Sequence, residues 1–121
     1  MNNNNILELE KSLFKYEYMS NVDYLNSVID DSYLEVGKSG YKITKKDVID
    51  ELSSLDEDRN IIIYNFSCNE ISNDIFLVHY FTKKESDNIF RTSIWKKENN
   101  NFKILFHQAS LYKDEINLIE F

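Results

Sequence analysis

The spacing of apolar residues predicts helices in the first half of the chain and strands in the second half. Over residues 6–19 apolar side chains recur with a period near 3.6, the pattern of one amphipathic helix of about four turns. A shorter stripe predicts a second helix over residues 20–31, capped by Ser20. Residues 33–36 alternate as in a short strand, and residues 44–52 form a third helical stripe that begins with a Thr-x-x-Asp capping box.

The second half of the chain has the pattern of an antiparallel meander. Four runs rich in β-branched and aromatic residues are separated by short turns that contain Asn, Asp or Ser, which predicts strands joined by hairpins. The predicted strands cover residues 60–70, 74–84, 88–97 and 101–110. Three helices followed by such strands indicate an α+β fold, in which the helices pack on one face of a strongly bent sheet and leave a cavity. We expect one domain over residues 1–121, with residues 1–5 as a disordered tail and residues 111–121 extending the last strand or covering a sheet edge.

The last predicted hairpin has two unusual faces. If the four residues 98–101 form its loop, Lys97 pairs with Phe102, and side chains alternate between the faces from there. One face then holds Arg91, Ser93, Trp95, Ile104, Phe106, Gln108 and Ser110, and the other holds Phe90, Thr92, Ile94, Leu105, His107 and Ala109. Both faces are mostly bulky, so we expect both to be covered. The helices would cover the first face, and a second copy of the chain would cover the second, giving a homodimer through Phe90, Thr92, Ile94, Leu105 and His107.

Arg91 is the most informative residue of the helix-covered face, because an arginine under helices is costly unless it is paired. Either a carboxylate such as Glu35 neutralises it, or it faces a wet cavity and binds an anion. In the second case Trp95 and the aromatic residues Phe14 and Tyr18 of the first helix would form the wall, with Ser93, Gln108 and Ser110 as polar groups. The alternative for each is structural: the aromatic residues would be core, and the polar residues would satisfy one another and Arg91.

Three stretches of the chain resemble the nuclear transport factor 2-like superfamily. They are "DDSYLEVGKSG" at 30–40, "RTSIW" at 91–95 and "FKILFHQAS" at 102–110. The resemblance covers about residues 5–110 and is nearest to the small SnoaL-like domains of unknown function, with the association domain of calmodulin-dependent kinase as a more distant relative. It implies a cone-shaped α+β fold in which Arg91 and the polar residues of the last strand point into the cone. It does not imply any one reaction.

The resemblance also bears on catalysis. Ketosteroid-isomerase-like relatives use a carboxylate inside the cone, and the matching position here is Val36, which cannot transfer a proton. Glu35 is adjacent, but alternation turns it to the other face unless a bulge intervenes. Tyr16 or Tyr18 would supply only a hydrogen-bond donor. An enzymatic alternative therefore depends on His79 or Tyr16 as the acid or base.

His79 and His107 are the only histidines. An even register in the preceding hairpin places His79 on the Arg91 face, whereas an odd register places Tyr80 there instead. A structural histidine is the more common case for each. The two lack the HxH and HExxH spacings of metal sites, so we expect no metal, and we expect no cofactor.

Composition narrows the partners. The net charge is −7 and no lysine or arginine cluster interrupts it, which argues against nucleic acid. No apolar segment of the sequence is long enough to span a membrane. The first residues lack the basic and apolar regions of a signal peptide, so we expect none. The single cysteine, Cys68, is expected to be an inert buried thiol, as in a cytoplasmic protein. Three functions remain open: a small polar or anionic ligand bound in the cone, a small lyase, isomerase or hydrolase, and a non-catalytic association module.

Overall fold

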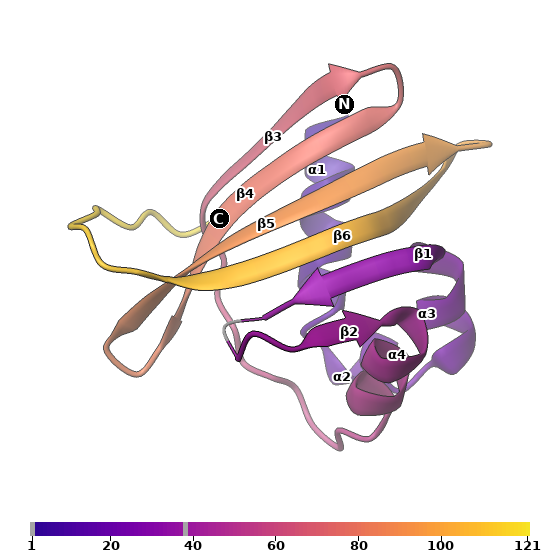
Figure 1. Cartoon of the computed structure of the whole chain (residues 1–121), viewed down its shortest axis with the longest axis horizontal. Helices are drawn as coiled ribbons and strands as arrows, with labels where there is room; N and C mark the ends of the chain where they lie inside the picture. The colour runs from indigo at the N-terminus through magenta and orange to yellow at the C-terminus, as the bar shows by residue number, and fades with distance from the viewer. Residues whose placement is uncertain (1, 38) are drawn as a thin grey trace.

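The computed structural model describes residues 2–37 and 39–121, which form helices packed on one face of a curled six-stranded sheet (Figure 1). The strands are β1 (Ile29–Val36), β2 (Lys42–Thr44), β3 (Tyr64–Ser72), β4 (Ile75–Lys84), β5 (Asp87–Glu98) and β6 (Asn101–Tyr112). Their order is β2-β1-β6-β5-β4-β3, and all neighbours are antiparallel except β1 and β6. The predicted α+β class and bent sheet are confirmed.

The helices are α1 (Asn2–Ser12), α2 (Tyr16–Met19), α3 (Val22–Val28) and α4 (Lys45–Ser53). In Figure 1, α1 runs behind β4, β5 and β6, and no described helix crosses the front of these strands. The core therefore lies between α1 and the concave face of the sheet. Its most deeply buried apolar members are Ile6, Met19, Leu25, Ile29, Ile63, Val78, Tyr80, Trp95 and Ile104.

The single helix predicted over residues 6–19 is wrong, because the chain breaks between α1 and α2. Lys15 is extended, with φ −105° and ψ 132°. The loop before β3 accounts for the break. Arg59 donates its backbone N–H to the Phe14 carbonyl at 3.0 Å, and the Asp58 carboxylate accepts the backbone N–H of Tyr16 at 2.6 Å. These tertiary bonds replace the helical bonds that a continuous helix would have made.

The other helix starts lie close to their predicted positions. The capping box of Thr44 and Asp47 is present at the start of α4, as predicted. The cap of α3 is Asn21, one residue after the predicted Ser20, and its side chain accepts the Tyr24 backbone N–H. Helix α1 already begins at Asn2, where the sequence predicts a disordered tail over residues 1–5, of which Met1 lies outside the described residues.

The predicted pairing of the last hairpin is correct at its tip and wrong beyond Trp95. Lys97 pairs with Phe102, and Trp95 pairs with Ile104 as predicted, but Ile94 pairs with Phe106. Leu105 is therefore an extra residue, a β-bulge that shifts the register by one. Because side chains alternate with a period of two, the shift exchanges the faces of every later residue of β6.

The bulge changes which residues share the concave face with Arg91. His107 and Ala109 line the cavity under the helices together with Arg91. Gln108 and Ser110, predicted on this face, pair with Thr92 and Phe90 and lie on the outer face instead. His107, predicted as a dimer contact on the outer face, is buried on the inner face.

The hairpin of β4 and β5 has the odd register. Tyr80 pairs with Arg91 and His79 pairs with Thr92, so Tyr80 is the inward residue and His79 lies on the outer face. There the His79 ring packs 5.3 Å from the Phe90 ring, measured between centroids. An aromatic cluster continues along this face: Phe81 lies 5.0 Å from Phe90 and 4.8 Å from Tyr112.

Alternation along β1 sets which of its side chains face the cavity. Ile29, Tyr33 and Glu35, which are separated by even numbers of residues, line the cavity. Val36, the position matched to the isomerase carboxylate, does not.

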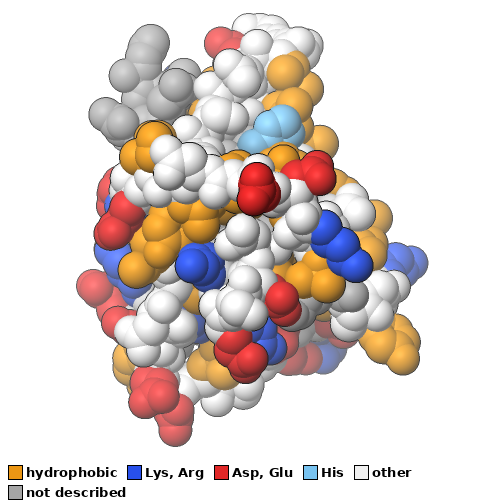
Figure 2. Space-filling view, turned by 90° about the vertical axis from the view of Figure 1, so that its left-hand side faces the viewer, with side chains coloured by type: hydrophobic (Ala, Val, Ile, Leu, Met, Phe, Trp, Pro, Cys, Tyr) orange, Lys and Arg blue, Asp and Glu red, His pale blue; other side chains and the backbone are white. Residues whose placement is uncertain are grey.

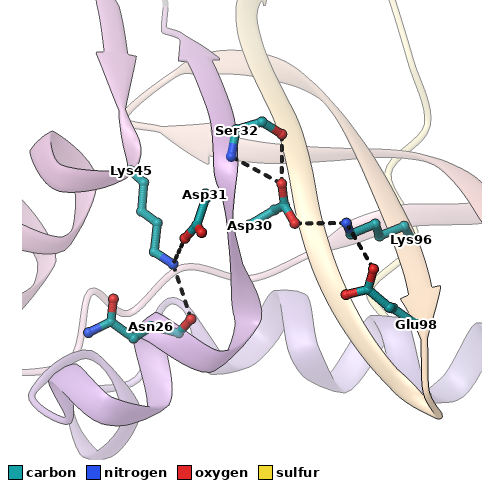
Figure 3. Close-up of polar contacts among 7 residues, drawn as sticks. All are labelled: Asn26, Asp30, Asp31, Ser32, Lys45, Lys96 and Glu98. Atoms are coloured by element: carbon teal, nitrogen blue, oxygen red, sulfur yellow. Dashed lines mark hydrogen bonds and ion pairs between the residues drawn. The ribbon is translucent and has the colours of Figure 1, made fainter.

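Ion pairs hold the first half of β1 in place. Asp30 lies 2.9 Å from Lys96 of β5, and Asp31 lies 3.0 Å from Lys45 at the start of α4 (Figure 3). Asp30 also accepts the backbone N–H and the hydroxyl of Ser32. Asp30 thus connects β1 to β5, and Asp31 connects it to α4.

The C-terminal segment both extends the last strand and covers an edge of the sheet, the two alternatives that the sequence left open. Leu111 and Tyr112 extend β6, and the following residues cross back to the start of β3. There Asn65 donates its backbone N–H to the Ile119 carbonyl at 2.8 Å, and its side chain accepts the Ile119 N–H at 2.7 Å. Phe121 donates its backbone N–H to the Ile63 carbonyl at 2.9 Å, so the segment covers the outer edge of the sheet.

Candidate functional site

A cavity of about 690 Å³ lies between α1, α4, the loop before β3 and the concave face of the sheet. Its charged and polar lining is Glu10, Tyr33, Glu35, Ser39, Glu51, Arg59, Asn60, Tyr80, Thr82, Lys83, Lys84, Arg91 and His107. Apolar side chains, among them Phe14, Leu52 and Ile104, complete the wall. About half of the lining residues are therefore charged or polar. Polar groups that converge against an apolar wall are a feature of small-molecule sites.

Arg91 of β5 is held rigidly on the floor of the cavity. Its Nε donates to the Thr82 hydroxyl at 2.8 Å, and its Nη1 donates to Nε2 of His107 at 3.2 Å. Thr82 comes from β4 and His107 from β6, so both neighbouring strands orient the guanidinium. The remaining donors of Arg91 have no hydrogen-bond partner among the described residues.

His107 is a neutral histidine of defined tautomer. A guanidinium can only donate, so Nε2 of His107 accepts from Arg91 and the ring proton lies on Nδ1. Nδ1 then donates to the Ser93 hydroxyl at 2.7 Å. Burial, together with the charges of Arg91 and Arg59, lowers the pKa of His107 to about 3. Its role here is to orient Arg91.

Glu10 is a buried acidic residue beneath the cavity floor. Its Oε1 accepts from the Tyr80 hydroxyl at 2.7 Å and its Oε2 accepts from the Trp95 indole N–H at 2.8 Å. Burial raises the pKa of Glu10, although the polar groups of Ser93, Tyr80 and Trp95 and the charge of Arg91 act in the opposite direction. Polar groups therefore continue from Arg91 and His107 at the cavity floor to Glu10 in the core.

Arg59 is the second arginine of the cavity, and it comes from the loop before β3. Its Nη1 donates to the Leu13 carbonyl at 3.5 Å, and its Cζ lies 4.9 Å from the centre of the Phe14 ring. The Cζ of Arg91 lies 6.0 Å from the same ring. Burial lowers the pKa of Arg59, and the nearby charge of Arg91 adds to this effect. The two guanidinium groups thus share one apolar wall and repel each other.

Tyr33 and Glu35 of β1 also line the cavity, on a different strand from Arg91. The Tyr33 hydroxyl donates to Oε1 of Glu35 at 2.5 Å. Burial raises the pKa of Tyr33, and the Glu35 charge raises it further, so this hydroxyl stays protonated. Glu35 is therefore a carboxylate oriented by a fixed donor.

The predicted site residues fall into three groups. Arg91 and Phe14 line the cavity. Ser93 and Trp95 point inward but are fully buried beneath it, where they bond His107 and Glu10. Gln108, Ser110, His79, Tyr16 and Tyr18 do not line it; Tyr18 packs on Tyr24, with ring centroids 4.9 Å apart.

Sequence reasoning missed Glu10, Arg59 and His107 as residues of the site, whereas Tyr80 was the inward residue expected for the odd register. Glu10 had a detectable signal, because it lies four residues after Ile6 and four before Phe14, inside the apolar stripe of the first helix. Arg59 had none, because its loop shows no periodic pattern. Among the described residues no group of three or more His, Cys, Asp or Glu side chains is arranged to hold a metal ion.

No protein-family model matches the sequence, and no curated protein matches it. Solved structures do match. An NTF2-like protein from Cytophaga hutchinsonii is 20% identical with a TM-score of 0.63, over 90% of this chain and 97% of that one. A CaMKII hub homology domain from Chlamydomonas reinhardtii is 13% identical with a TM-score of 0.70, over 93% of this chain and 99% of that one. A protein of unknown function from Pectobacterium atrosepticum is 13% identical with a TM-score of 0.68, over 89% and 85% of the two chains.

These comparisons show that the protein has the NTF2-like fold, which confirms the predicted resemblance. At such identities they show the fold alone. Within the described residues, no helix combines the length and the apolar composition needed to cross a membrane. Figure 2 shows acidic, basic and hydrophobic side chains interspersed on one face, without a continuous basic patch.

Proposed function

We propose that the protein binds a small anionic or polar ligand in the cavity, with Arg91 and Arg59 as the anion-binding residues. The observation that carries the proposal is that both arginines of the chain line one cavity. Within the described part of the chain all ion pairs are made by lysines, and neither guanidinium has a carboxylate within 4.0 Å.

The energetics support an anion at this position. Two like charges on a partly buried apolar wall destabilise each other, and their desolvation is not offset by an internal ion pair. A bound carboxylate would accept charge-assisted hydrogen bonds from both guanidinium groups and reduce their repulsion. Because Thr82 and His107 already orient Arg91, little side-chain entropy is lost on binding.

The test is calorimetric binding of a panel of small carboxylates to wild type, Arg91→Gln and Arg59→Gln, with Lys42→Gln as control. Lys42 is an exposed cation of β2 that does not line the cavity. Losing one charge-assisted contact costs about 1.5–3 kcal/mol, so each arginine variant should weaken binding by about 10- to 100-fold. The control should bind like wild type. Unchanged affinity in both arginine variants, or no binding by the whole panel, would overturn the proposal.

A second candidate function is self-association through the outer face of the sheet. It is supported by the half-buried aromatic cluster around Phe90 and by two structural neighbours. One is the hub homology domain described above. The other was assigned as a calcium/calmodulin-dependent kinase II association domain from Exiguobacterium sibiricum, 12% identical with a TM-score of 0.63 over 93% of each chain. In this arrangement Phe90, Thr92 and Ile94 would contact a second copy.

Light scattering during gel filtration tests the association. Wild type should elute as a dimer at micromolar concentration and Phe90→Asp as a monomer. Ile71→Asp, which makes the same kind of change on an exposed residue of β3, should leave the dimer intact. A wild-type protein that elutes as a monomer would contradict the proposed self-association.

The enzymatic alternative depends on His79 or Tyr16 as the acid or base. Because neither residue lines the cavity, the structure gives this alternative no support. The cytoplasm remains the proposed location, which the single free cysteine supports.

A further inference from the structure

The cavity contains, besides the two arginines, a glutamate that forms no ion pair with any described residue. Glu35 is half-buried and lines the cavity, and its side chain has one hydrogen-bond partner among the described residues, the Tyr33 hydroxyl. No lysine or arginine nitrogen of the described chain lies within 4.0 Å of its carboxylate. Opposite charges in one partly desolvated cavity would normally close into an ion pair, so their separation needs a cause.

The sheet supplies that cause. Glu35 on β1 is the Cα neighbour of His107 on β6, and Arg91 is on β5, the next strand. Arg91 also lies two residues along β5 from Ser93, the partner of His107. With strands about 4.8 Å apart and a rise of about 3.3 Å per residue, the backbones of Glu35 and Arg91 are separated by about 12 Å. Arg91 cannot swing toward Glu35, because its guanidinium is held by Thr82 on one side and His107 on the other. Glu35 is likewise held by Tyr33.

We propose that the ligand of this cavity is a zwitterion, whose carboxylate binds Arg91 and Arg59 and whose ammonium binds Glu35. The inference rests on the anion-binding function proposed above and names its ligand class. A ligand with only a negative charge would lie near Glu35 without offsetting it and would be repelled by it. A zwitterion with its charges several bonds apart offsets the desolvation of both the guanidinium groups and the carboxylate. An ω-amino acid fits this spacing better than an α-amino acid, whose charges are on neighbouring atoms.

The decisive experiment compares ligands of one chain length on the wild-type protein. Binding of pentanoate, 5-aminopentanoate, 2-aminopentanoate and pentylamine is measured by calorimetry at pH 7. We expect 5-aminopentanoate to bind at least about tenfold more tightly than each of the other three, because only it places opposite charges at both ends. Wild-type protein that binds pentanoate as tightly as 5-aminopentanoate overturns the zwitterion and leaves the anion site standing. Absence of binding by all four probes to about 10 mM overturns both proposals.

Variants separate the role of Glu35 from general effects. Glu35→Gln keeps the size of the side chain and an acceptor for Tyr33, and it should weaken 5-aminopentanoate by at least about tenfold while leaving pentanoate equal or tighter. Glu57→Gln, an exposed carboxylate outside the cavity, is the matched control and should change neither affinity. If the Glu35→Gln variant keeps the wild-type ratio of the two affinities, Glu35 does not bind the ammonium group. The ligand comparison on wild type decides the proposal even where this variant fails to fold.

Discussion

Replacing Glu10 by glutamine should destabilise the protein, because two buried donors then compete for one acceptor. In the structure Tyr80 and Trp95 donate to different oxygens of Glu10, at 2.7 and 2.8 Å. Both donors are almost fully inaccessible to water, with 1% and 0% exposure. Glutamine keeps one oxygen and replaces the other by an NH₂ group, which is itself a donor. One of the two buried donors therefore loses its partner.

The loss of stability can be calculated from the one buried donor that is left without an acceptor. A buried donor left without an acceptor costs about 1–3 kcal/mol, so Glu10→Gln should lower the free energy of unfolding by about that amount. This is a large share of the 5–15 kcal/mol that is usual for a whole domain. With a urea slope of about 1–3 kcal/mol per molar, the denaturation midpoint should fall by about 1 M.

The difference in stability between wild type and Glu10→Gln should also depend on pH. Burial raises the pKa of Glu10, so the folded protein holds this proton more tightly than the unfolded chain, in which a glutamate titrates near pH 4.3. The resulting stabilisation is complete below the unfolded pKa and is lost as the pH rises through the folded pKa. The stability advantage of wild type over Glu10→Gln should therefore be larger at pH 5 than at pH 8.

The assay is urea denaturation followed by tryptophan fluorescence, since Trp95 is the only tryptophan and is bonded to Glu10. The control is Glu8→Gln, which makes the same change at an exposed position of the same helix. If Glu10→Gln shifts the midpoint no further than Glu8→Gln does, the two-donor account of this carboxylate is refuted. An advantage of wild type that grows toward high pH would refute the direction of the pKa shift.

Three further predictions test other parts of the structure. The pKa of His107 is about 3 in the folded protein and about 6.5 in an unfolded chain. Urea denaturation should therefore show wild type losing stability relative to His107→Gln as the pH falls below about 6.5. Equal dependence of the two free energies of unfolding on pH would contradict this prediction. The pKa of Asp30 is lowered by the Ser32 hydroxyl and by Lys96, so Asp30→Asn should lower the free energy of unfolding by about 1–3 kcal/mol at pH 7. The same variant should lose less stability than wild type below pH 4 in urea denaturation, and an equal loss in both proteins would contradict it. Asn65 has φ 52° and binds the C-terminal segment, so Asn65→Ala should cost about 1–3 kcal/mol and speed proteolysis within residues 113–121; an unchanged cleavage rate would count against the anchoring role.

Features with a local cause could be predicted from the sequence. The capping box of Thr44 and Asp47 forms as expected, because all its bonds join residues three apart. The turn at the tip of the last hairpin is equally local: Asn99 and Asn100 both take positive φ, which asparagine tolerates better than most residues, and the strands on either side pair as predicted. Element types and the α+β order followed from such signals and from periodicity.

Which residues form the site depends on interactions between distant parts of the chain. The bulge at Leu105 leaves no clear trace in composition, yet one extra residue exchanges the faces of His107 and Gln108. Glu10 meets Tyr80 and Trp95 across 70 and 85 residues, and Arg59 reaches Leu13 across 46. A sequence pattern encodes which face a side chain takes within a regular element, and it determined here that Arg91 points under the helices. Where the elements deviate from regularity, and which groups meet there, was decided only by packing, because bulges and helix breaks are stabilised by contacts with residues far away in the chain.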